Sequence, residues 1–286
     1  MDNLFLTAWV ASIPGIGPKQ FAILKQSFPD LGHLLKVTVP ELVTIGIPEE
    51  VATEISTYKY QHHPQEIEQF CSENNVHLIS SLPPLSEIPD PPIVLYVQGE
   101  SPDFTKPMIA VVGTRKVTEY GKKVTWDFTT QLVKAGYMIV SSFMYGVDVI
   151  AHEATIAARG RSVAVLGYGL GAPLYPHSNE KLAEKMLKNG SCLLTEYPPW
   201  QVSLPQNFAR WNRIVSGLSQ EVVVTEAAAK SGSLITASQA VNQGRKVFVV
   251  SGPNDSPSGE GTKELVHMGA KLVAKVDDIL AELGEK

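Results

Sequence analysis

Two short segments of the sequence place arginine beside groups that bind phosphate or stack on bases. One is Gly113-Thr114-Arg115, in which a glycine, a hydroxyl and a guanidinium follow an apolar run. The other is the segment 207–213, which contains two arginines, two aromatic side chains and an amide. Arginines hold phosphates and aromatic rings stack on unpaired bases, so both segments indicate binding of a polyanion such as a nucleic acid. An ordinary turn and a core-facing helix are the alternatives.

Three further segments contain small residues that let a ligand approach the backbone. They are 141–148, 166–171 and 225–236, and each follows an apolar run that is typical of a strand. In open α/β sheets, ligands bind outside the carboxyl ends of the strands, where helices begin. We therefore expect these loops to join the two arginine segments in one extended site for a polyanion or a nucleotide. Tight turning explains the glycines of 166–171 equally well.

Enzymatic chemistry has weaker support. Asp148 and His152 share a helix face at a spacing of four, but no serine or cysteine nucleophile is tied to them by sequence. Glu226 follows a strand, where a carboxylate serves either as a general base or as a hydrogen-bonding anchor for its loop. The seven histidines show no metal-ligand spacing, so we expect neither a metal nor a cofactor.

The composition is that of a folded protein without a membrane or export segment. Hydrophobic residues make up 44% and charged residues 19% of the 286 positions, and no apolar stretch approaches the ~20 residues of a membrane span. Cys71 and Cys192 form no disulfide framework, which favours the cytoplasm. A net charge of −5 excludes a globally basic protein, so any nucleic-acid site must be a local patch.

A scaffold of buried strands is needed to bring the loops together. Beyond residue 93 short apolar runs alternate with helical stretches, and runs such as Val222-Val223-Val224 are typical of strands covered on both faces. The pattern predicts an α/β domain with a mostly parallel, doubly wound sheet and helices on both faces. The predicted strands are 93–97, 108–112, 137–140, 162–166, 192–194, 221–224, 246–250 and 271–274.

The first 68 residues indicate a small all-helical domain instead. Apolar residues recur three to four apart, and breaks at 13–18, 28–30 and 45–48 separate four short helices. A proline-rich run, 83–92, covers or links the two parts before the first clear strand. We therefore predict two domains, 1–68 and 69–286.

The chemistry-bearing segments resemble, in order, the motifs of the DprA/Smf family of DNA-processing proteins, over residues 82 to 280. Many separate motifs coincide, which makes the resemblance specific. The matching motifs are Gly113-Thr114-Arg115, Gly146-Val147-Asp148 with Ala151-His152, 164–167, 175–179, 195–199, 212–219, 226–237, Gln243-Gly244-Arg245, and Gly261-Thr262 to Gly269-Ala270. The turn at 13–18 looks like a helix-hairpin-helix turn.

The resemblance implies a Rossmann-like domain that binds single-stranded DNA, forms a homodimer and helps to load the RecA recombinase in natural transformation and recombination, without catalysis. It also implies that residues 1–68 are a helix-hairpin-helix or SAM-like domain. Because the sequence ends at Lys286, we expect no winged-helix module of the kind that some members append. The expected DNA-binding residues are Gly113, Thr114, Arg115, Ser141, Gly146, Phe208, Arg210, Trp211, Asn212, Arg213, Lys230, Ser231, Gly232, Ser233 and Arg245.

Two of the expected DNA-facing positions depart from the family pattern. Tyr145 stands where members usually have an arginine, and Trp211 replaces the first arginine of an Arg-Asn-Arg triplet. Each lost phosphate contact flattens the salt dependence, and stacking on a base offsets the loss of affinity. The alternative is a nucleotide-binding or phosphoribohydrolase-like enzyme on a related fold, suggested by 259–262, although Leu265 stands where that pattern has a carboxylate.

Overall fold

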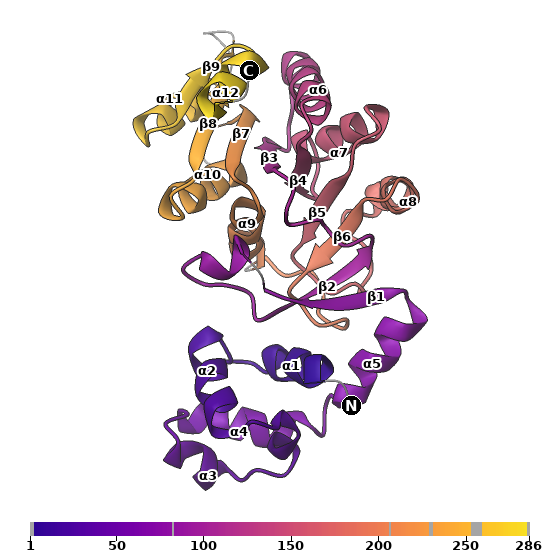
Figure 1. Cartoon of the computed structure of the whole chain (residues 1–286), viewed down its shortest axis with the longest axis vertical. Coiled ribbons are helices and arrows are strands. Elements are labelled where there is room, and N and C mark those ends of the chain that lie inside the picture. The colour runs from indigo at the N-terminus through magenta and orange to yellow at the C-terminus, as the bar shows by residue number, and fades with distance from the viewer. Residues whose placement is uncertain (1–2, 82, 206, 229–230, 253–258, 285–286) are drawn as a thin grey trace.

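The computed structural model describes residues 3–81, 83–205, 207–228, 231–252 and 259–284. Figure 1 shows a helical part at the bottom of the view and a larger α/β part above it. The helical part consists of α1 Asn3–Ser12, α2 Pro18–Ser27, the 3-10 helix η1 Leu31–Leu35, α3 Val39–Thr44, α4 Glu49–Tyr58 and α5 Pro64–Glu73. Its helices begin where prolines and capping residues interrupt the chain, as at Thr38, whose backbone N–H donates to Glu41.

The α/β part is built on a sheet that, within the described residues, has nine strands in the order β1-β2-β6-β5-β4-β3-β7-β8-β9. Strand β2 runs antiparallel to β1 and to β6, and the other neighbouring strands run parallel. The mostly parallel sheet predicted from the sequence is therefore confirmed. The strands are β1 Val76–Ser80, β2 Val94–Gly99, β3 Met108–Gly113, β4 Met138–Ser142, β5 Ser162–Leu166, β6 Cys192–Thr195, β7 Glu221–Glu226, β8 Lys246–Val250 and β9 Lys271–Val273.

Every predicted strand overlaps an observed one, but β1 was missed. It is an edge strand of five residues, of which only Val76 is fully buried. An edge strand has one unpaired side and little apolar surface to bury, so its sequence lacks the continuous apolar run of β3 or β7. The antiparallel pairing of β1 with β2 attaches the helical part to the sheet.

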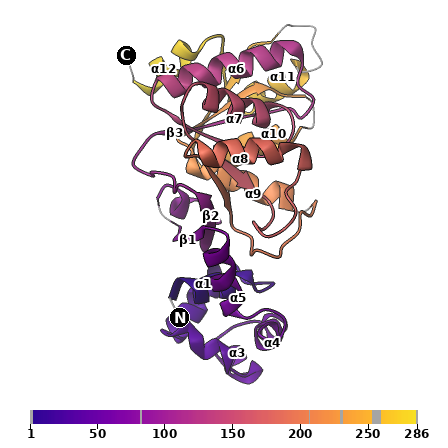
Figure 2. The same ribbon diagram turned by 90° about the vertical axis from the view of Figure 1, so that its right-hand side faces the viewer.

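Helices cover both faces of the sheet, and Figure 2 shows α6, α7 and α8 on the near face. Alternate residues of β3 explain its uninterrupted apolar run: Met108 and Ala110 pack toward α9 and α10, whereas Ile109 and Val111 pack toward α6 and α7. The helices are α6 Glu119–Lys134, α7 Val147–Ala157, α8 Glu180–Lys188, α9 Asn207–Leu218, α10 Gly232–Asn242, α11 Gly259–His267 and α12 Val276–Leu283, with short 3-10 helices η2 Leu85–Glu87 and η3 His177–Asn179.

The helical part packs directly against the end of the sheet. The indole N–H of Trp9 donates to the carbonyl of His62 at 2.7 Å, and the ring of His62 stacks on Trp200 with centroids 3.9 Å apart. Its core also includes Val76 of β1 and Val94 of β2. Residue 68 lies within α5, which continues into the approach to β1, so a domain boundary at 68 stays a prediction.

Candidate nucleic-acid interface

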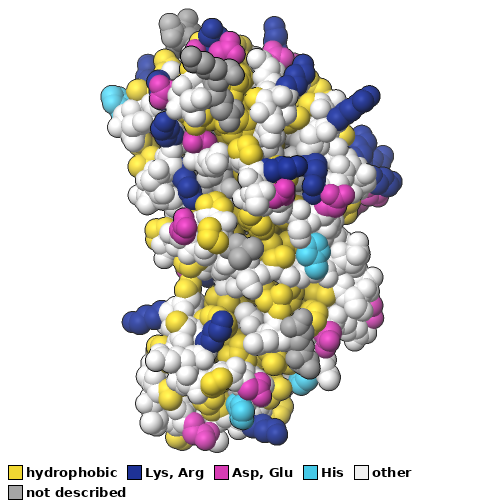
Figure 3. Space-filling model, viewed as in Figure 1, with side chains coloured by type: hydrophobic (Ala, Val, Ile, Leu, Met, Phe, Trp, Pro, Cys, Tyr) yellow, Lys and Arg dark blue, Asp and Glu magenta, His cyan; other side chains and the backbone are white. Residues whose placement is uncertain are grey.

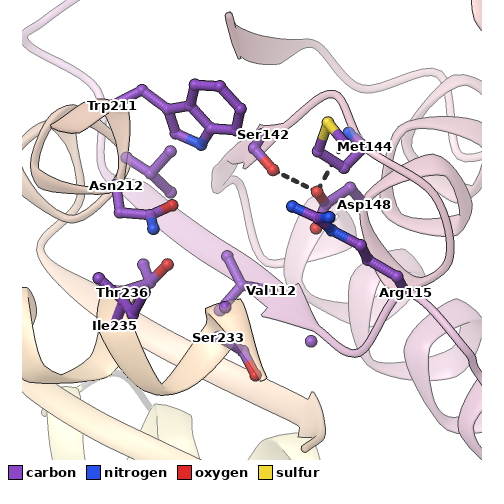
Figure 4. Close-up of a pocket in the computed structure, with 13 residues that line it drawn as sticks. Val112, Arg115, Ser142, Met144, Asp148, Trp211, Asn212, Ser233, Ile235 and Thr236 are labelled. Carbon is purple, nitrogen blue, oxygen red and sulfur yellow. Dashed lines mark hydrogen bonds between the residues drawn. The ribbon is translucent and has the colours of Figure 1, made fainter. Parts of the chain in front are cut away.

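A cavity of about 140 Å³ opens where β3 and β4 end and α9 and α10 face them (Figure 4). Four of the five segments singled out in the sequence contribute to its wall. The lining residues are Val112, Gly113, Arg115, Ser142, Met144, Asp148, Trp211, Asn212, Val215, Gly232, Ser233, Ile235 and Thr236. The cavity therefore lies at the carboxyl edge of a parallel sheet, the position at which such folds bind ligands.

The loop after β3 carries Arg115, and Glu226 holds this loop in place. The backbone N–H of Thr114 donates to the carbonyl of Glu226 at 2.8 Å, and the N–H of Thr118 donates to its carboxylate at 3.0 Å. Gly121 leaves room for that carboxylate, because a Cβ there would lie 1.7 Å from Oε2 of Glu226. Of the two interpretations of Glu226, the structure supports the anchor for the loop.

Gly146 brings the loop after β4 against the loop that carries Arg115. Its φ is +79°, and a Cβ at this position would lie 2.2 Å from the carbonyl oxygen of Thr114. The next residue, Val147, donates its backbone N–H to that same oxygen at 3.2 Å. Only glycine tolerates both the left-handed backbone and this approach, so Gly146 positions the site without a side chain of its own.

Asp148 is a buried carboxylate at one end of the cavity. It accepts hydrogen bonds from the hydroxyl of Ser142 and from the backbone N–H of Met144, the latter at 3.2 Å. Burial raises the pKa of Asp148, while these hydrogen bonds and the charge of Arg115 act in the opposite direction. Figure 4 shows the guanidinium of Arg115 beside this carboxylate at the cavity wall.

His152 does not form a catalytic pair with Asp148. Its Nε2–H donates to the carbonyl of Ser142 at 2.9 Å, so its Nδ1 accepts from the hydroxyl of Ser162 at 3.0 Å. Burial lowers the pKa of His152 to about 4. The ring is therefore neutral near pH 7 and holds the end of β4, which leads into the cavity wall.

Helix α9 supplies the wall that contains an aromatic ring and an amide. Trp211 is only 3% exposed, and its ring packs so closely on Gly167 that a Cβ there would lie 1.5 Å from it. Asn212 is 7% exposed, and Figure 4 shows its side-chain amide directed into the cavity. Gly167 therefore packs behind Trp211 and Gly169 packs against the carbonyl of Pro198, and none of the residues 166–171 lines the cavity.

Helix α10 begins at the cavity. Ser231 is its N-cap residue, and the hydroxyls of Ser231 and Ser233 form a hydrogen bond with each other. Gly232 and Ser233 line the cavity at the first turn, where helical N–H groups and the helix dipole favour an anion. Lys230, which was expected beside them, and the side chain of Phe208 lie outside the described part of the structure.

Among the expected DNA-binding residues that do not line the cavity are Ser141, Arg210, Arg213 and Arg245. Ser141 is fully buried and donates its hydroxyl to the carbonyl of Val111 at 2.7 Å, so it joins two strands, while the neighbouring Ser142 lines the cavity. Arg245 comes directly before β8 and beyond the far end of α10. Arg213 is 5% exposed and held by carboxylates on another side of α9. The motif that contains Arg213 therefore did not predict whether its side chain is exposed to solvent.

Arg210 and the turn at 13–18 lie near each other, away from the cavity. The side chain of Arg210 is 51% exposed and 3.7 Å from Glu196. A narrow crevice is lined by Gly17 and Pro18 of the turn together with Arg210 and Arg213. The turn therefore faces the α/β part across this crevice.

The described residues contain no group of three or more His, Cys, Asp or Glu side chains that could hold a metal ion. Among the same residues, no helix combines the length and apolar character that crossing a membrane requires.

Figure 3 shows Lys and Arg side chains gathered over the α/β part on the face in view, despite the net charge of −5.

A mostly parallel sheet with helices on both faces and a cavity at the carboxyl edge of its parallel strands defines an α/β protein of the open, doubly wound class, in which ligands bind at that edge. The sequence profile described as DNA recombination-mediator protein A matches residues 63–284. The chain belongs to this family, the DprA/Smf family of DNA-processing proteins, which confirms the resemblance seen in its motifs.

The curated relatives agree over most of the chain. DNA processing protein DprA of Bacillus subtilis is 41% identical over 203 residues, which cover 71% of this chain and 68% of that protein. Protein Smf of Escherichia coli is also 41% identical, and the match covers 70% of this chain and 54% of the relative. Protein Smf of Synechocystis is 34% identical over 99% of this chain and 73% of its own length. The chain therefore spans between about half and three quarters of these relatives.

Two solved structures share the fold. The crystal structure of DNA processing protein A from Streptococcus pneumoniae matches with a TM-score of 0.80 and 29% identity, over 99% of both chains. DNA processing protein A from Helicobacter pylori, whose structure concerns its binding of single-stranded DNA, matches with a TM-score of 0.66 and 29% identity over 74% of this chain and 97% of that one. The first match includes the helical part as well as the sheet.

Proposed function

We propose that this protein binds single-stranded DNA without acting on it chemically and mediates the loading of the RecA recombinase. The observation that carries the proposal is the cavity at the carboxyl edge of the sheet, where Arg115 and the N-terminus of α10 offer positive charge and Asn212 offers an amide. These groups hold phosphates and base edges, and a single strand presents both. The relationship to a protein whose structure concerns single-stranded DNA binding supports the same reading.

The geometry supports binding rather than catalysis. His152 and Asp148 are each engaged by serine and backbone groups, and Glu226 holds a loop. The phosphoribohydrolase alternative requires a carboxylate at position 265, where a fully buried leucine packs in the core. No acid–base pair of the predicted kind thus faces the cavity from the described residues, and the proposed role needs none.

Tyr145 favours stacking on a base in place of a phosphate contact, whereas Trp211 is buried against Gly167 and replaces a cation without offering a ring face to a base. Tyr145 is 45% exposed and directly precedes Gly146, the residue that lies against the loop that carries Arg115. An aromatic ring contributes ~1–3 kcal/mol when a base stacks on it, whereas a lost cation reduces the log–log salt slope by about 0.7. We therefore propose a binding mode with a shallower salt dependence than the family pattern implies.

The partners and location follow from the same proposal. A recombination mediator works on DNA inside the cell, so we propose a cytoplasmic protein that contacts RecA and acts as a homodimer. The helical part, residues 1–68 as predicted from the sequence, is then an accessory domain beside the α/β part. Light scattering of the purified chain tests the dimer, and pull-down with RecA tests the recombinase contact.

Fluorescence anisotropy with labelled oligo-dT tests DNA binding. At about 50 mM salt we expect saturable binding that weakens as salt rises. Arg115→Ala should reduce it strongly, and Glu184→Gln on the exposed side of α8 provides a control. Absence of binding by the wild-type protein at this salt concentration would refute the proposal. Binding of AMP with release of its base would support the enzyme instead.

A further inference from the structure

We propose that Arg213 is a positioning residue: it holds the rear side of α9, so that Trp211 and Asn212 face the cavity. This inference rests on the proposed function, because its consequence is an effect on DNA affinity. It departs from the expectation that Arg213 contacts DNA, and it gives Glu196 and Asp90 a role that their sequence positions did not suggest.

The contacts of Arg213 form a closed network. Its two terminal nitrogens donate to the two carboxylate oxygens of Glu196, each at 2.7 Å, and its Nε donates to Asp90 at 3.0 Å. The same Nε also donates to the backbone carbonyl of Asp90 at 2.8 Å. A guanidinium with this many partners at short distance has little capacity left for a phosphate.

The two carboxylate partners come from two different segments outside α9. Glu196 follows directly after β6, and Asp90 belongs to the proline-rich segment that precedes β2. Arg213 therefore ties one side of α9 to a strand end and to the connecting segment. Glu196 is only 10% exposed, so its pairing with Arg213 is shielded from competing water and salt, whereas Asp90 is 49% exposed.

The helix geometry separates this network from the cavity. At 100° per residue, Arg210 and Arg213 lie on one side of α9, and Trp211, Asn212 and Val215 lie on the opposite side. The lining residues agree with this geometry: the second group lines the cavity, and Arg210 and Arg213 line the crevices behind the helix. Rotation or fraying of α9 thus changes both sides together.

The electrostatic balance makes the network sensitive to loss of one member. Burial opposes the charge of Arg213, but Glu196 and Asp90 outweigh it and raise the pKa of the guanidinium. Removing Glu196 leaves the buried guanidinium with only the half-exposed Asp90, and removing Arg213 leaves Glu196 with only the longer contact to Arg210, whereas neutralising both Arg213 and Glu196 removes that penalty. Single substitutions should therefore be more disruptive than the matching double substitution.

Glu196→Gln distinguishes positioning from direct contact by the sign of its effect. If Arg213 touched a phosphate, removing the competing carboxylate would release the guanidinium and increase affinity for oligo-dT. Positioning predicts the reverse, a loss of affinity of about tenfold, because α9 loses its anchor. Glu184→Gln makes the same chemical change at an exposed site and should have no effect.

Arg213→Gln and the double variant Arg213→Gln with Glu196→Gln complete the set. We expect Arg213→Gln to weaken binding with an unchanged salt slope, whereas loss of a direct phosphate contact lowers the slope by about 0.7. In the double variant two amides can pair without charge, and binding should recover most of the way. Recovery without the cation is incompatible with direct contact.

Hydrogen exchange of the DNA-free protein provides a readout that does not depend on the proposed function. Amides of α9 should exchange faster in each single variant and return toward wild type in the double variant. If wild type does not bind oligo-dT, the proposed function is refuted, and exchange in α9 still decides the role of Arg213. Higher affinity in Glu196→Gln, a lower salt slope in Arg213→Gln, or unchanged exchange in α9 would each overturn the inference.

Discussion

Arg115 and Arg213 occupy two regions that differ in almost every physical respect. Arg115 is exposed at the cavity, on a loop that is itself held by Glu226 and Gly146. Arg213 is 5% exposed behind α9, between Glu196 and Asp90. Both belong to motifs that the family shares, and both seemed equally suited to DNA when only the sequence was considered. A cation's role is set by what lies within about 4 Å of it, because desolvation and pairing decide whether it is available.

The two regions also differ in the kind of contact that holds each arginine in place. The cavity region depends on glycines and backbone hydrogen bonds, which position N–H groups and side chains at the cavity wall. The region behind α9 depends on ion pairs, which consume the side chains that form them. Substitutions in the cavity region should therefore change DNA binding directly. Substitutions behind α9 should change it only through the position of α9.

Gly146→Ala should produce the largest change in the cavity region. The substitution imposes a left-handed backbone on alanine and places its Cβ 2.2 Å from the carbonyl oxygen of Thr114, so we expect a loss of about 3 kcal/mol or more in unfolding free energy. Gly136→Ala is a matched control, because its φ is +96° with open space around it. Urea denaturation measures both. Equal losses would show that the contact between the two loops is unimportant.

Acid should lower the free energy of unfolding through protonation of His152, which supports the cavity wall. The folded state lowers the pKa of His152 to about 4, below its unfolded value, so the unfolded chain takes up the proton first. Stability that is present above pH 6.5 is then lost as the pH falls toward 4, by at most about 3 kcal/mol. Urea midpoints at several pH values measure this loss. His152→Gln should flatten the curve, and an unchanged curve would contradict the assignment.

Arg115→Ala should reduce affinity for oligo-dT by about ten- to a hundredfold, since a charge-assisted hydrogen bond contributes ~1.5–3 kcal/mol. The log–log salt slope should fall by about 0.7 at the same time. Arg115→Lys keeps the charge but loses the forked geometry, so the slope should persist while affinity drops less. Anisotropy titrations over a salt series test both. If Arg115→Ala leaves the salt slope unchanged, Arg115 does not contact a phosphate and the proposed difference between Arg115 and Arg213 is wrong.

Arg245→Ala should have the smallest effect. The residue lies beyond the end of α10 that is remote from the cavity, and its guanidinium makes a long 3.5 Å hydrogen bond to the carbonyl of Gly217. We expect affinity within about twofold of wild type and an unchanged salt slope. The same titration measures this. A clear loss of slope would extend the DNA-binding surface to the opposite end of α10.

Much of the fold was predictable because buried parallel strands require apolar residues on both sides. Val222 and Val224 pack on one face and Val223 packs on the other, so the strand appears in the sequence as consecutive apolar residues. The edge strand β1 escaped prediction because it faces water on part of its surface. Loops at the carboxyl edge could also be named in advance, since the sheet topology sends them to one place.

The details of the site were less accessible. Ser141 and Ser142 are neighbours, and strand alternation decides that one joins β3 while the other lines the cavity. His152 was paired with Asp148 by helical spacing, yet both side chains found partners on β4 and its neighbours. Spacing along a helix shows which side chains share a face but not which groups lie opposite them.

The pattern of neighbouring residues was therefore enough to predict an α/β scaffold, its family and the loops that carry chemistry. Whether each arginine meets solvent or a carboxylate depended on folding, because Arg213 joins Glu196, 17 residues away, and Asp90, 123 residues away. Hydrophobic periodicity is a property of adjacent residues and is visible in a linear sequence. Charge pairing across such separations exists only after the chain has brought distant segments together.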